Sequence, residues 1–496
     1  MHDDELSLGD LGVENPERPL PRRERARIDF SDAAVSARRV EANARKATKA
    51  RVPQRARAAS AAVTPEGMPS EDAVALAFVD RHTEHIYVAP WHRWYTWDGM
   101  RWREDSTGKI YELIRNLVRA LVAGGKAERS TANGSFVAGV EKLLRTDQRI
   151  VVLPEQLDVD PWALNTQSGI VDLRTGELTE HSKDALCTRV ANAPCDVTQG
   201  AELWQEFLAG ITQDDIELQF YLQRVAGYCA SGVVSEDVLP YLFGIGANGK
   251  SSFAEAIAHV LGDYAKIFAP EVLMEAKGER HPTELAQFMG VRFALTSEPA
   301  SSAAWNDSRI KSLTGDAVIS ARFMRGDNFT FPRTHKTMVL GNHMPRLADV
   351  THAIRRRVQM VPFRAVFEAT TPPGMRERLK AEAGGAILAW IVQGAAMWAA
   401  AGTAPPQSVR DCTADYLSDQ DVIGQWLEER CTRDAKAFEL SGALHRNYTA
   451  WCEAQGHHPK SNAKVSEHLV SCGFRKERGS IGIVFRGLRI GGECRV

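Results

Sequence analysis

The sequence has few cysteines and no closely spaced cysteine pair. Its eight cysteines lie between Cys187 and Cys494, and none of them forms a C-x-x-C motif. Zinc ribbons bind their metal through such pairs, and small secreted domains depend on dense disulfide frameworks. The scatter of cysteines argues against both classes, and we expect a reducing, cytoplasmic environment for the chain.

We expect neither a signal peptide nor a membrane span in this sequence. Residues 1–17 are acidic and polar, without the apolar segment that a secretory signal needs. The longest apolar run, residues 384–402, is rich in Gly and Ala and is interrupted by Gln393. Such weak hydropathy favours a buried helix, so we expect no membrane partner.

The chain has little net charge, although acidic and basic residues are unevenly distributed over its first seventy residues. The formal net charge is −2, but residues 18–57 carry thirteen Lys or Arg against four acids. Residues 1–70 contain few large apolar side chains and cannot bury enough surface to offset the entropy of ordering. We predict a disordered charged tail, whose basic stretch either binds phosphates without sequence preference or serves as a solvated linker.

An aromatic cluster follows a short amphipathic helix that we predict near residues 72–81. The aromatic residues alternate with polar residues around an Asp98-Gly99 turn, which is typical of a β-hairpin. Rings interleaved with basic residues can stack on bases, but aromatic side chains in a sheet more often form its core, and we favour the core. The cluster consists of Tyr87, Trp91, Trp94, Tyr95, Trp97 and Trp102.

A glycine-rich motif carries the clearest chemical signal in the chain. An apolar strand predicted at residues 238–243 runs into G-x-x-x-x-G-K-S, and the residues that follow have helical periodicity. Glycines let such a loop wrap phosphate oxygens with backbone N–H groups, and the helix N-terminus adds partial positive charge. Lys250 would then reach the β- and γ-phosphates of ATP, and the Ser251 hydroxyl would ligate Mg²⁺. The expected nucleotide-binding residues are Gly244, Gly246, Ala247, Asn248, Gly249, Lys250, Ser251 and Ser252.

Hydrolysis also needs an acid, a polar sensor and a cation beside the terminal phosphate. Glu298 follows a predicted strand at residues 291–296 and would orient the attacking water. Asn342 follows the next strand, and its amide would hydrogen-bond the γ-phosphate or the water. Arg356 and Arg357 precede a further strand, and their guanidinium groups suit an arginine finger that reaches a neighbouring subunit. The alternative for each is an ordinary surface residue at a strand end.

The C-terminal residues have the outline of a winged helix. Helices are predicted at residues 422–431, 441–453 and 462–472, and a strand, turn and strand follow over residues 474–488. Basic residues on the third helix and the wing form a pattern typical of duplex binding, although winged helices also mediate protein contacts. The expected DNA-binding residues of this module are Lys464, His468, Arg475 and Lys476.

Five stretches between Gly244 and Phe363 together resemble the superfamily 3 helicase domain of phage and plasmid primase-helicases, related to the poxvirus-type enzymes. They are GIGANGKSSF, LAQFMGVRFALTSEP, IKSLTGDAVISARFM, HKTMVLGNHMP and RRRVQMVPF. The resemblance implies that the catalytic residues are Lys250, Glu298, Asn342, Arg356 and Arg357. Ser251 and Glu298 would be the Mg²⁺ ligands. Many relatives carry two adjacent acids where this chain has Ser297 before Glu298.

The resemblance also implies a hairpin at residues 317–331 that projects into a central channel. Its DNA contacts, with those of the neighbouring residues, would be Lys311, Arg322 and Arg325. Upstream, the segment around Trp94 and the phrase LNTQSGIVDLRTGEL look like the domain that precedes the helicase in this family.

We therefore expect an α/β chain with an AAA+-like P-loop ATPase core, a preceding α/β domain, a C-terminal winged-helix domain and a disordered N-terminal tail. The expected boundaries are 1–70 for the tail, 71–205 for the preceding domain, 206–405 for the ATPase and 410–496 for the winged helix. A helical region at residues 202–230 would lead into the ATPase strands.

The function expected from this organisation is that of an ATP-dependent replicative DNA helicase of phage or plasmid type, acting in the cytoplasm of a bacterial host. Its cofactors would be ATP and Mg²⁺. Its partners would be single-stranded and forked DNA, further copies of the chain in a hexamer, and a separate primase or polymerase. One alternative is a replication initiator or loader that uses ATP as an assembly switch. Another is a small-molecule kinase, against which the basic C-terminal module argues.

Overall fold

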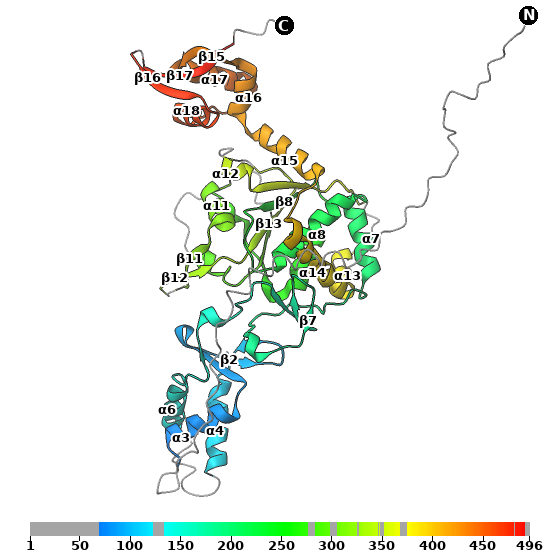
Figure 1. The fold of residues 1–496 in the computed structure, drawn as a ribbon, viewed down its shortest axis with the longest axis vertical. Coiled ribbons are helices and arrows are strands. Elements are labelled where there is room, and N and C mark those ends of the chain that lie inside the picture. Colours follow the sequence, from blue (N-terminus) through cyan, green and yellow to red (C-terminus); the bar gives the residue numbers. More distant parts are fainter. Residues whose placement is uncertain are drawn as a thin grey trace, which may run out of the picture. The chain divides into compact units, whose positions relative to one another are not determined.

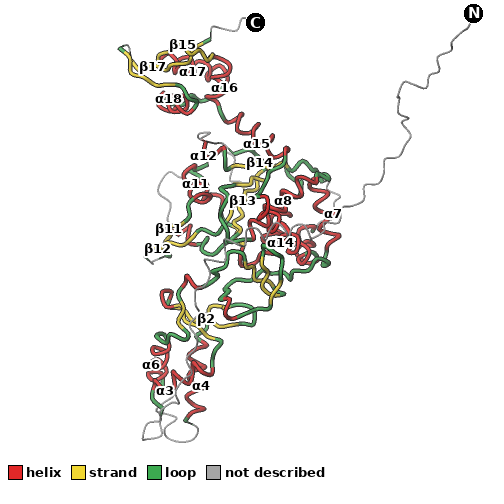
Figure 2. The backbone as a smooth tube through the Cα atoms, in the orientation of Figure 1, coloured by secondary structure: helices red, strands yellow, loops and turns green. Residues whose placement is uncertain are grey.

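The computed structural model (Figure 1) describes residues 69–122, 133–275, 283–297, 305–324, 327–345, 347, 352–367, 374–480 and 482–491. The predicted tail, residues 1–70, lies outside this set except for its last two residues. The described residues form a mixed α/β fold, and Figure 2 distinguishes its strands in yellow from its helices in red. Short 3-10 helices lie at Ala89–Trp91, Pro154–Gln156, Lys183–Ala185, Gly262–Tyr264 and Pro270–Leu273.

The first described region combines three helices with a four-stranded sheet of order β3-β2-β1-β4. The predicted first helix is confirmed as α3, and Ser70 caps it by accepting a hydrogen bond from the Ala73 N–H. The predicted hairpin around Asp98-Gly99 is also confirmed, as β2 and β3. The elements are α3 (Glu71–Arg81), β1 (His85–Val88), β2 (Arg93–Trp97), β3 (Trp102–Glu104), α4 (Lys109–Leu121), α6 (Gly134–Leu144) and β4 (Val151–Val152).

The aromatic residues of this sheet contribute to its core, in agreement with the interpretation that we favoured from the sequence. Tyr87, Trp94 and Trp102 are all buried, and the helices α3, α4 and α6 pack against the first two. The Trp94 indole N–H donates a 2.8 Å hydrogen bond to the buried carboxylate of Glu141 on α6. Because this bond satisfies both groups inside the core, Trp94 joins the sheet to α6 and is not presented for base stacking.

A small antiparallel sheet and two helices lead into the central sheet. The predicted strand-turn-strand is confirmed as β5 (Ala163–Thr166) and β6 (Gly169–Asp172), and β7 (Leu178–Thr179) completes the sheet. The predicted helical region 202–230 consists of two helices, α7 (Ala201–Thr212) and α8 (Ile216–Ala230). They separate because two residues between them have positive φ and the Asp215 carboxylate caps α8 through the Leu218 N–H.

A five-stranded sheet lies at the centre of the chain, and every neighbouring pair in it is parallel. The carboxyl ends of all five strands therefore meet at one edge of the sheet. The strands, in spatial order, are β14 (Val358–Pro362), β8 (Leu239–Phe243), β13 (Lys336–Gly341), β10 (Phe293–Ser297) and β9 (Ala265–Ile267).

The central sheet is buried on both faces because successive side chains enter different cores. Leu242 and Leu340 belong to one core, whereas the preceding residues Tyr241 and Val339 belong to the other. Helices α7, α8, α9 (Lys250–Leu261) and α14 (Gly384–Ala401) contribute to the first core, and α11 (Asp307–Gly315) and α15 (Gln407–Gln420) to the second. Figure 1 shows α8 and α14 on one side of β8 and β13 and α11 on the other. Shorter helices are α10 (Thr283–Ala286), α12 (His352–Arg355) and α13 (Met375–Glu382).

The apolar run at residues 384–402 forms α14, which packs against α8. Among the described helices α14 alone has the length and apolar composition of a membrane span, and 61% of that stretch is buried within the protein. Gly394 of α14 and Gly227 of α8 lie at the contact, where a Cβ on either would collide with the backbone of the other helix. This close packing agrees with the buried helix expected from the sequence.

The C-terminal residues form six elements around one hydrophobic core. The three predicted helices and the predicted hairpin are present, but β15 was not predicted, and it joins the hairpin in a three-stranded sheet of order β15-β17-β16. The elements are α16 (Val422–Arg430), β15 (Cys431–Leu440), α17 (Ser441–Gln455), α18 (Asn462–Ser471), β16 (Arg475–Gly479) and β17 (Gly482–Ile490).

Candidate nucleotide site and nucleic-acid surfaces

The glycine turn, residues 244–249, joins the carboxyl end of β8 to the first residue of α9. Within it Gly246, Ala247 and Gly249 have positive φ values of 108°, 45° and 81°. Glycine adopts such angles without steric cost, whereas at Ala247 the conformation stores strain of the kind that gathers at ligand-binding turns. The expected strand, turn and helix are therefore present, with the turn at the carboxyl edge of the sheet.

Lys250 lies at the centre of a polar network within this turn. Its side chain is buried, and its Nζ donates to the Gly244 carbonyl at 3.0 Å, to Asn248 Oδ1 at 3.4 Å and to Asn342 Oδ1 at 2.5 Å. The Asn248 amide in turn donates to the Phe363 carbonyl at 3.3 Å. The network holds the ammonium group at the carboxyl edge of the sheet, next to the first turn of α9.

Two glycines of the turn are required by close packing. A Cβ at Gly244 would collide with the Asn248 amide and with the Phe363 carbonyl oxygen, and a Cβ at Gly249 would collide with Ile211 of α7. The turn is also held from outside, because the Phe367 N–H donates a 2.9 Å hydrogen bond to the Ala247 carbonyl. The remaining predicted nucleotide-binding residues, Ser251 and Ser252, are partly exposed in the first turn of α9.

The predicted sensor lies beside the turn, whereas the predicted acid cannot be placed. Asn342 directly follows β13, the strand that pairs with β8, so its amide reaches Lys250. Glu298 lies outside the described residues; β10 ends at Ser297 on the same carboxyl edge. The structure thus brings Lys250 and Asn342 together and leaves the role of Glu298 as a prediction.

Tyr241 positions residues 341–343, here called the sensor segment because they contain the predicted sensor Asn342, and it was not singled out from the sequence. The Tyr241 ring lies so close to Gly341 that a Cβ there would collide with it, and its hydroxyl donates a 2.5 Å hydrogen bond to the His343 carbonyl. Both contacts fix the backbone on either side of Asn342. Gly341, which precedes Asn342, was the signal in the sequence that could have revealed this contact, because a glycine inside a strand indicates the close approach of a neighbouring side chain.

Arg356 and Arg357 lie at the amino ends of the strands of the central sheet, whereas the glycine turn lies at their carboxyl ends. They precede β14, whose first residue pairs with Leu239 at the start of β8. Arg357 is buried, and it donates to Asp237 at 2.9 Å, to Thr314 Oγ1 at 2.9 Å and to the Ala353 carbonyl at 2.9 Å. This corrects the suggestion that Arg357 reaches a neighbouring subunit, because its guanidinium is held inside its own chain. The side chain of Arg356 is 56% exposed, and its guanidinium lies 3.4 Å from the Asp237 carboxylate.

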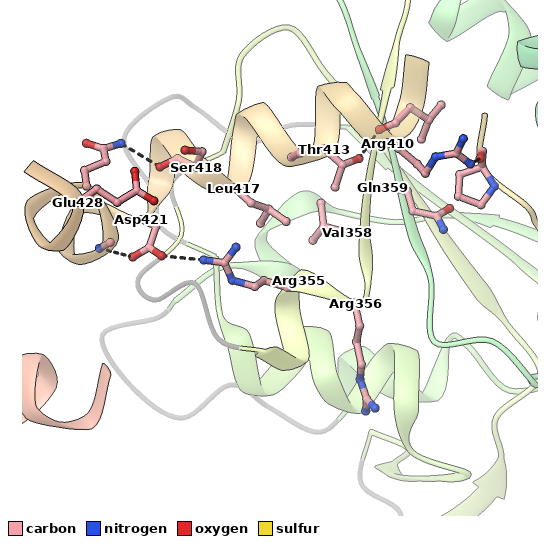
Figure 3. A pocket seen from close by; sticks show the side chains of 15 residues that line it. Arg355, Arg356, Val358, Gln359, Arg410, Thr413, Leu417, Ser418, Asp421 and Glu428 are labelled. Carbon is pink, nitrogen blue, oxygen red and sulfur yellow. Dashed lines mark hydrogen bonds and ion pairs between the residues drawn. The ribbon is translucent and has the colours of Figure 1, made fainter. Parts of the chain in front are cut away.

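A cavity of about 490 Å³ adjoins Arg356 at the amino ends of the strands (Figure 3). Its lining comes from α12, β14, α15 and α16 and includes no residue of the glycine turn. Arg355 reaches Asp421 at 2.7 Å, and Figure 3 shows that Arg356 extends away from this pair. We assign no catalytic chemistry to the cavity, because the network around Lys250 lies at the other end of β8.

The hairpin predicted at residues 317–331 is present as a two-stranded antiparallel unit, β11 (Val318–Arg322) and β12 (Asn328–Pro332), and its projection into a channel stays a prediction. Arg322 at the end of β11 is exposed, Lys311 on α11 is partly exposed, and Arg325 lies outside the described residues. The sequence did not reveal that the end of the hairpin is also apolar and aromatic. Phe323 is 47% exposed and stacks on Phe329 with ring centroids 4.4 Å apart.

The basic residues predicted on the C-terminal module differ in accessibility. Lys464 on α18 and Arg475 and Lys476 on β16 are exposed, as expected for residues that contact a nucleic acid. His468 was expected to face outward, but its side chain is only 17% exposed and its Nε2 lies 3.6 Å from Asp421. This corrects the prediction for His468, whose ring packs toward the start of α16.

Two family models match long segments of the chain. Residues 75–213 match the family described as D5 N terminal like, and residues 242–357 match a family of unknown function, DUF5906. The second segment contains the glycine turn, the hairpin and the sensor segment.

Two viral proteins are similar to the chain. "Putative helicase L207/L206" of Acanthamoeba polyphaga mimivirus is 26% identical over 310 residues, which cover 55% of this chain and 32% of the relative. "Putative helicase 022R" of Frog virus 3 (isolate Goorha) is 26% identical over 274 residues, which cover 51% of this chain and 28% of the relative. The chain thus matches about a third of each curated relative's length.

Solved structures of the NrS-1 C-terminal region are also similar in outline. The first has a TM-score of 0.47 and 8% sequence identity and covers 84% of this chain and 98% of that one. The second has a TM-score of 0.45 at the same identity and covers 84% and 99%.

The described residues have a mixed α/β fold, and the chain is similar over two long segments to these family models and to the two viral proteins named as putative helicases. More specifically, the chain is a phage/viral primase-helicase-like protein.

Proposed function

We propose that this chain is an ATP-driven DNA helicase whose active sites form between subunits of a ring. The observation that carries the proposal is the position of Lys250 Nζ, 2.5 Å from Asn342 and 3.0 Å from the Gly244 carbonyl at the carboxyl edge of a parallel sheet. Phosphate oxygens of a nucleotide would replace these acceptors around the ammonium group, and the first turn of α9 adds its partial positive charge.

The residues around the turn fit a magnesium nucleotide. Ser251 is the second residue of α9 and is partly exposed, so its hydroxyl is available as an oxygen ligand beside Lys250. Mg²⁺ would neutralise charge on the β- and γ-phosphates. Asn342 would hold the γ-phosphate or the attacking water, and Glu298 would orient that water by the role proposed from the sequence.

The geometry also supports an arginine supplied by a neighbouring subunit. Arg356 lies at the amino end of β14, whereas the glycine turn lies at the carboxyl end of the adjacent β8. Five residues of strand separate the two ends by roughly 16 Å, so Arg356 cannot reach a nucleotide bound by its own chain. In a closed ring with head-to-tail contacts, this exposed guanidinium would face the next subunit's site. We propose that this ring is a hexamer, the state expected from the resemblance to superfamily 3 helicases.

The hairpin β11–β12 and the C-terminal module would contact DNA. Arg322 offers a phosphate contact at the end of the hairpin, and the stacked pair Phe323 and Phe329 offers a flat aromatic surface for an unpaired base. Arg475 and Lys476 are exposed on β16, where the expected winged helix would carry its duplex contacts. ATP turnover would move the hairpin along one strand.

An ATPase and unwinding experiment tests the proposal. The full chain is assayed for ATP hydrolysis with and without single-stranded DNA, and for strand displacement on a forked duplex, beside Lys250→Ala and the control Lys266→Ala on the exposed surface of β9. We expect Lys250→Ala to lower turnover by on the order of 100-fold or more and the control to leave it unchanged. Full turnover in Lys250→Ala would exclude the proposed site.

A replication initiator or loader is the second candidate, favoured by the exposed basic residues on β16. Such a protein would use ATP only to assemble and would hold duplex DNA without opening it. Forked-duplex displacement together with a footprint separates the two: a helicase displaces the strand under ATP, whereas a loader protects a fixed segment and leaves it paired. Native mass measurement with and without ATP gives the ring size in either case.

A further inference from the structure

Three side chains that commonly bind metals converge after α3, far in sequence from the glycine turn. His82 caps the end of α3, Glu84 follows in the turn, and His85 is the first residue of β1. Glu84 Oε1 lies 3.1 Å from His82 Nδ1 and 3.4 Å from His85 Nε2. One potential ligand atom from each residue lies within 4.8 Å of the others.

These separations are close to those of a tetrahedral zinc site. With bonds of about 2.0–2.1 Å, neighbouring ligand atoms in such a site lie about 3.3 Å apart, so two of the three separations already fit. His82 and Glu84 are partly exposed, with side-chain exposures of 22% and 36%, which leaves a path for an ion and for a water molecule as fourth ligand.

His85 is a buried group whose second nitrogen points at the cluster without a hydrogen bond. The residue is 1% exposed, and its Nε2 makes no hydrogen bond by geometry. A buried polar atom without such a partner costs free energy, and a structure rarely retains one without a reason.

The other nitrogen of His85 is already held in the manner of a metal ligand. Its Nδ1 lies 2.9 Å from the Thr96 hydroxyl, on the residue that pairs with His85 across β1 and β2. When Nδ1–H donates to Thr96, the lone pair of Nε2 faces the Glu84 carboxylate at 3.4 Å. A cation between two such electron-rich atoms would stabilise them, and metal-binding histidines usually donate their other N–H to a fixed acceptor.

The position of the second histidine is also restrained. The His82 ring packs against Phe78 on the preceding turn of α3, with ring centroids 4.5 Å apart. The backbone of the intervening residue is fixed as well, because the Glu84 carbonyl accepts a 2.8 Å hydrogen bond from the Trp97 N–H. All three side chains thus start from backbone positions that the sheet and helix hold in place.

We propose that His82, Glu84 and His85 bind a divalent transition-metal ion of the zinc class, with water completing the coordination. Two imidazoles and one carboxylate favour zinc over Mg²⁺ or Ca²⁺, which prefer oxygen ligands. The ion would tie the end of α3 to the first strand of its sheet and stabilise this region. The site does not depend on nucleotide binding, so it is independent of the proposed helicase activity.

Zinc binding to the full chain tests the site. The chain is purified without a histidine tag, stripped with a chelator, and titrated with Zn²⁺ in competition with a chromogenic chelator. The eight cysteines are a separate source of zinc binding, so the wild type is compared with His82→Gln and Glu84→Gln. We expect one tight equivalent in the wild type and its loss in both variants. Cobalt(II) should give the intense visible absorption of a tetrahedral site in the wild type only.

Two further variants separate ligation from folding. His92→Asn, at an exposed histidine of the same region, should keep the tight equivalent. Thr96→Val removes only the hydrogen bond behind His85 and should weaken zinc binding by about 10-fold to 100-fold. Zinc should raise the unfolding temperature of the wild type and not that of Glu84→Gln. The proposal is overturned if the wild type binds no tight equivalent, or if folded His82→Gln and Glu84→Gln retain it.

Discussion

The ammonium nitrogen of Lys250 lies 2.5 Å from Oδ1 of Asn342, although 92 residues separate them in sequence. The pairing of β8 with β13 produces this contact, since Lys250 and Asn342 both follow the carboxyl ends of these strands. Parallel strands gather such side chains at one edge, and this edge of an α/β sheet is where ligands bind. The contact is therefore the observation that best supports the nucleotide site that we propose.

Replacing Asn342 should impair hydrolysis more than nucleotide binding. In Asn342→Ala the γ-phosphate or the attacking water would lose one hydrogen bond that is used in the transition state, whereas the glycine turn would keep its backbone donors. We expect turnover to fall by about 10-fold to 100-fold. Steady-state ATPase rates and the dissociation constant of a non-hydrolysable ATP analogue give the two quantities.

His343→Asn is the matched control for Asn342→Ala, because it changes the exposed side chain of the next residue in the same segment. Its turnover should equal that of the wild type. Equal losses of affinity and turnover in Asn342→Ala would instead assign the amide to ground-state nucleotide binding.

The two neighbouring arginines should differ in their effects on stability. Arg357 is buried and donates to Asp237 and Thr314, so Arg357→Ala leaves partners without their hydrogen bonds and should cost about 3 kcal/mol of unfolding free energy. Arg356→Ala removes an exposed side chain and should change it by less than about 0.5 kcal/mol. Thermal unfolding followed by circular dichroism compares the two variants, and a similar loss in both would contradict the assignment.

Mixed rings should reveal whether Arg356 acts on a neighbour's nucleotide. Arg356→Ala alone and Lys250→Ala alone should both lose ATP hydrolysis. In an equimolar mixture, an interface that joins an intact Lys250 site to an intact Arg356 is competent, and random assembly gives roughly a quarter of such interfaces. Partial recovery of turnover on mixing is therefore expected, whereas a mixture as inactive as its components would argue for action within one subunit.

Lowering the pH should destabilise the chain through His335. This ring is fully buried, stacks on Phe288 at 4.8 Å, and has no hydrogen bond at either nitrogen. Burial, with the charges of Arg333 and Lys336, lowers the pKa of His335 to about 3. The unfolded chain, with a pKa near 6.5, binds the proton first, so the stabilisation is complete above pH 6.5 and is lost as the pH falls toward 3.

The variant His335→Phe measures this contribution, because it keeps the stacked ring and removes the titrating group. Between pH 7 and pH 5 the wild type should lose about 2 kcal/mol more unfolding free energy than the variant. Denaturant unfolding at several pH values gives the difference. His85, whose pKa is lowered to about 4, titrates equally in both chains and therefore cancels. Parallel pH dependences in the two chains would contradict the prediction.

The sequence predicted the central strands well because their apolar runs are bounded by glycines and polar residues. It also predicted the edge at which Lys250 and Asn342 meet, since parallel strands fix that edge without knowledge of side-chain contacts. It could not distinguish Arg356 from Arg357. Burial of one and exposure of the other depend on Asp237 and Thr314, which come from segments distant in sequence.

The misses at the C-terminal module have a similar origin. The strand β15 carries mainly exposed residues and shows no regular alternation of buried and exposed positions, so periodicity gave no signal for it. It becomes a strand because β17 supplies its hydrogen-bonding partner. His468 was predicted to face outward on the third helix, whereas its side chain is only 17% exposed and its Nε2 lies 3.6 Å from Asp421, the residue before α16.

The end of the hairpin should bind single-stranded DNA through two separable interactions. Arg322 would contact a phosphate, so Arg322→Ala should weaken binding and reduce the slope of log affinity against log salt by about 1. Phe323 is half-exposed and stacked on Phe329, so Phe323→Ala should cost about 1–3 kcal/mol of binding free energy without changing the salt slope. Fluorescence anisotropy with a labelled oligonucleotide at several salt concentrations measures both effects.

The control is Lys266→Ala, which removes an exposed cation on β9 and not on the hairpin. It should leave the DNA affinity and the salt slope unchanged. If Arg322→Ala and Phe323→Ala bind DNA as the wild type does, the hairpin is not a DNA contact, and the unwinding mechanism loses the element that couples ATP turnover to strand movement.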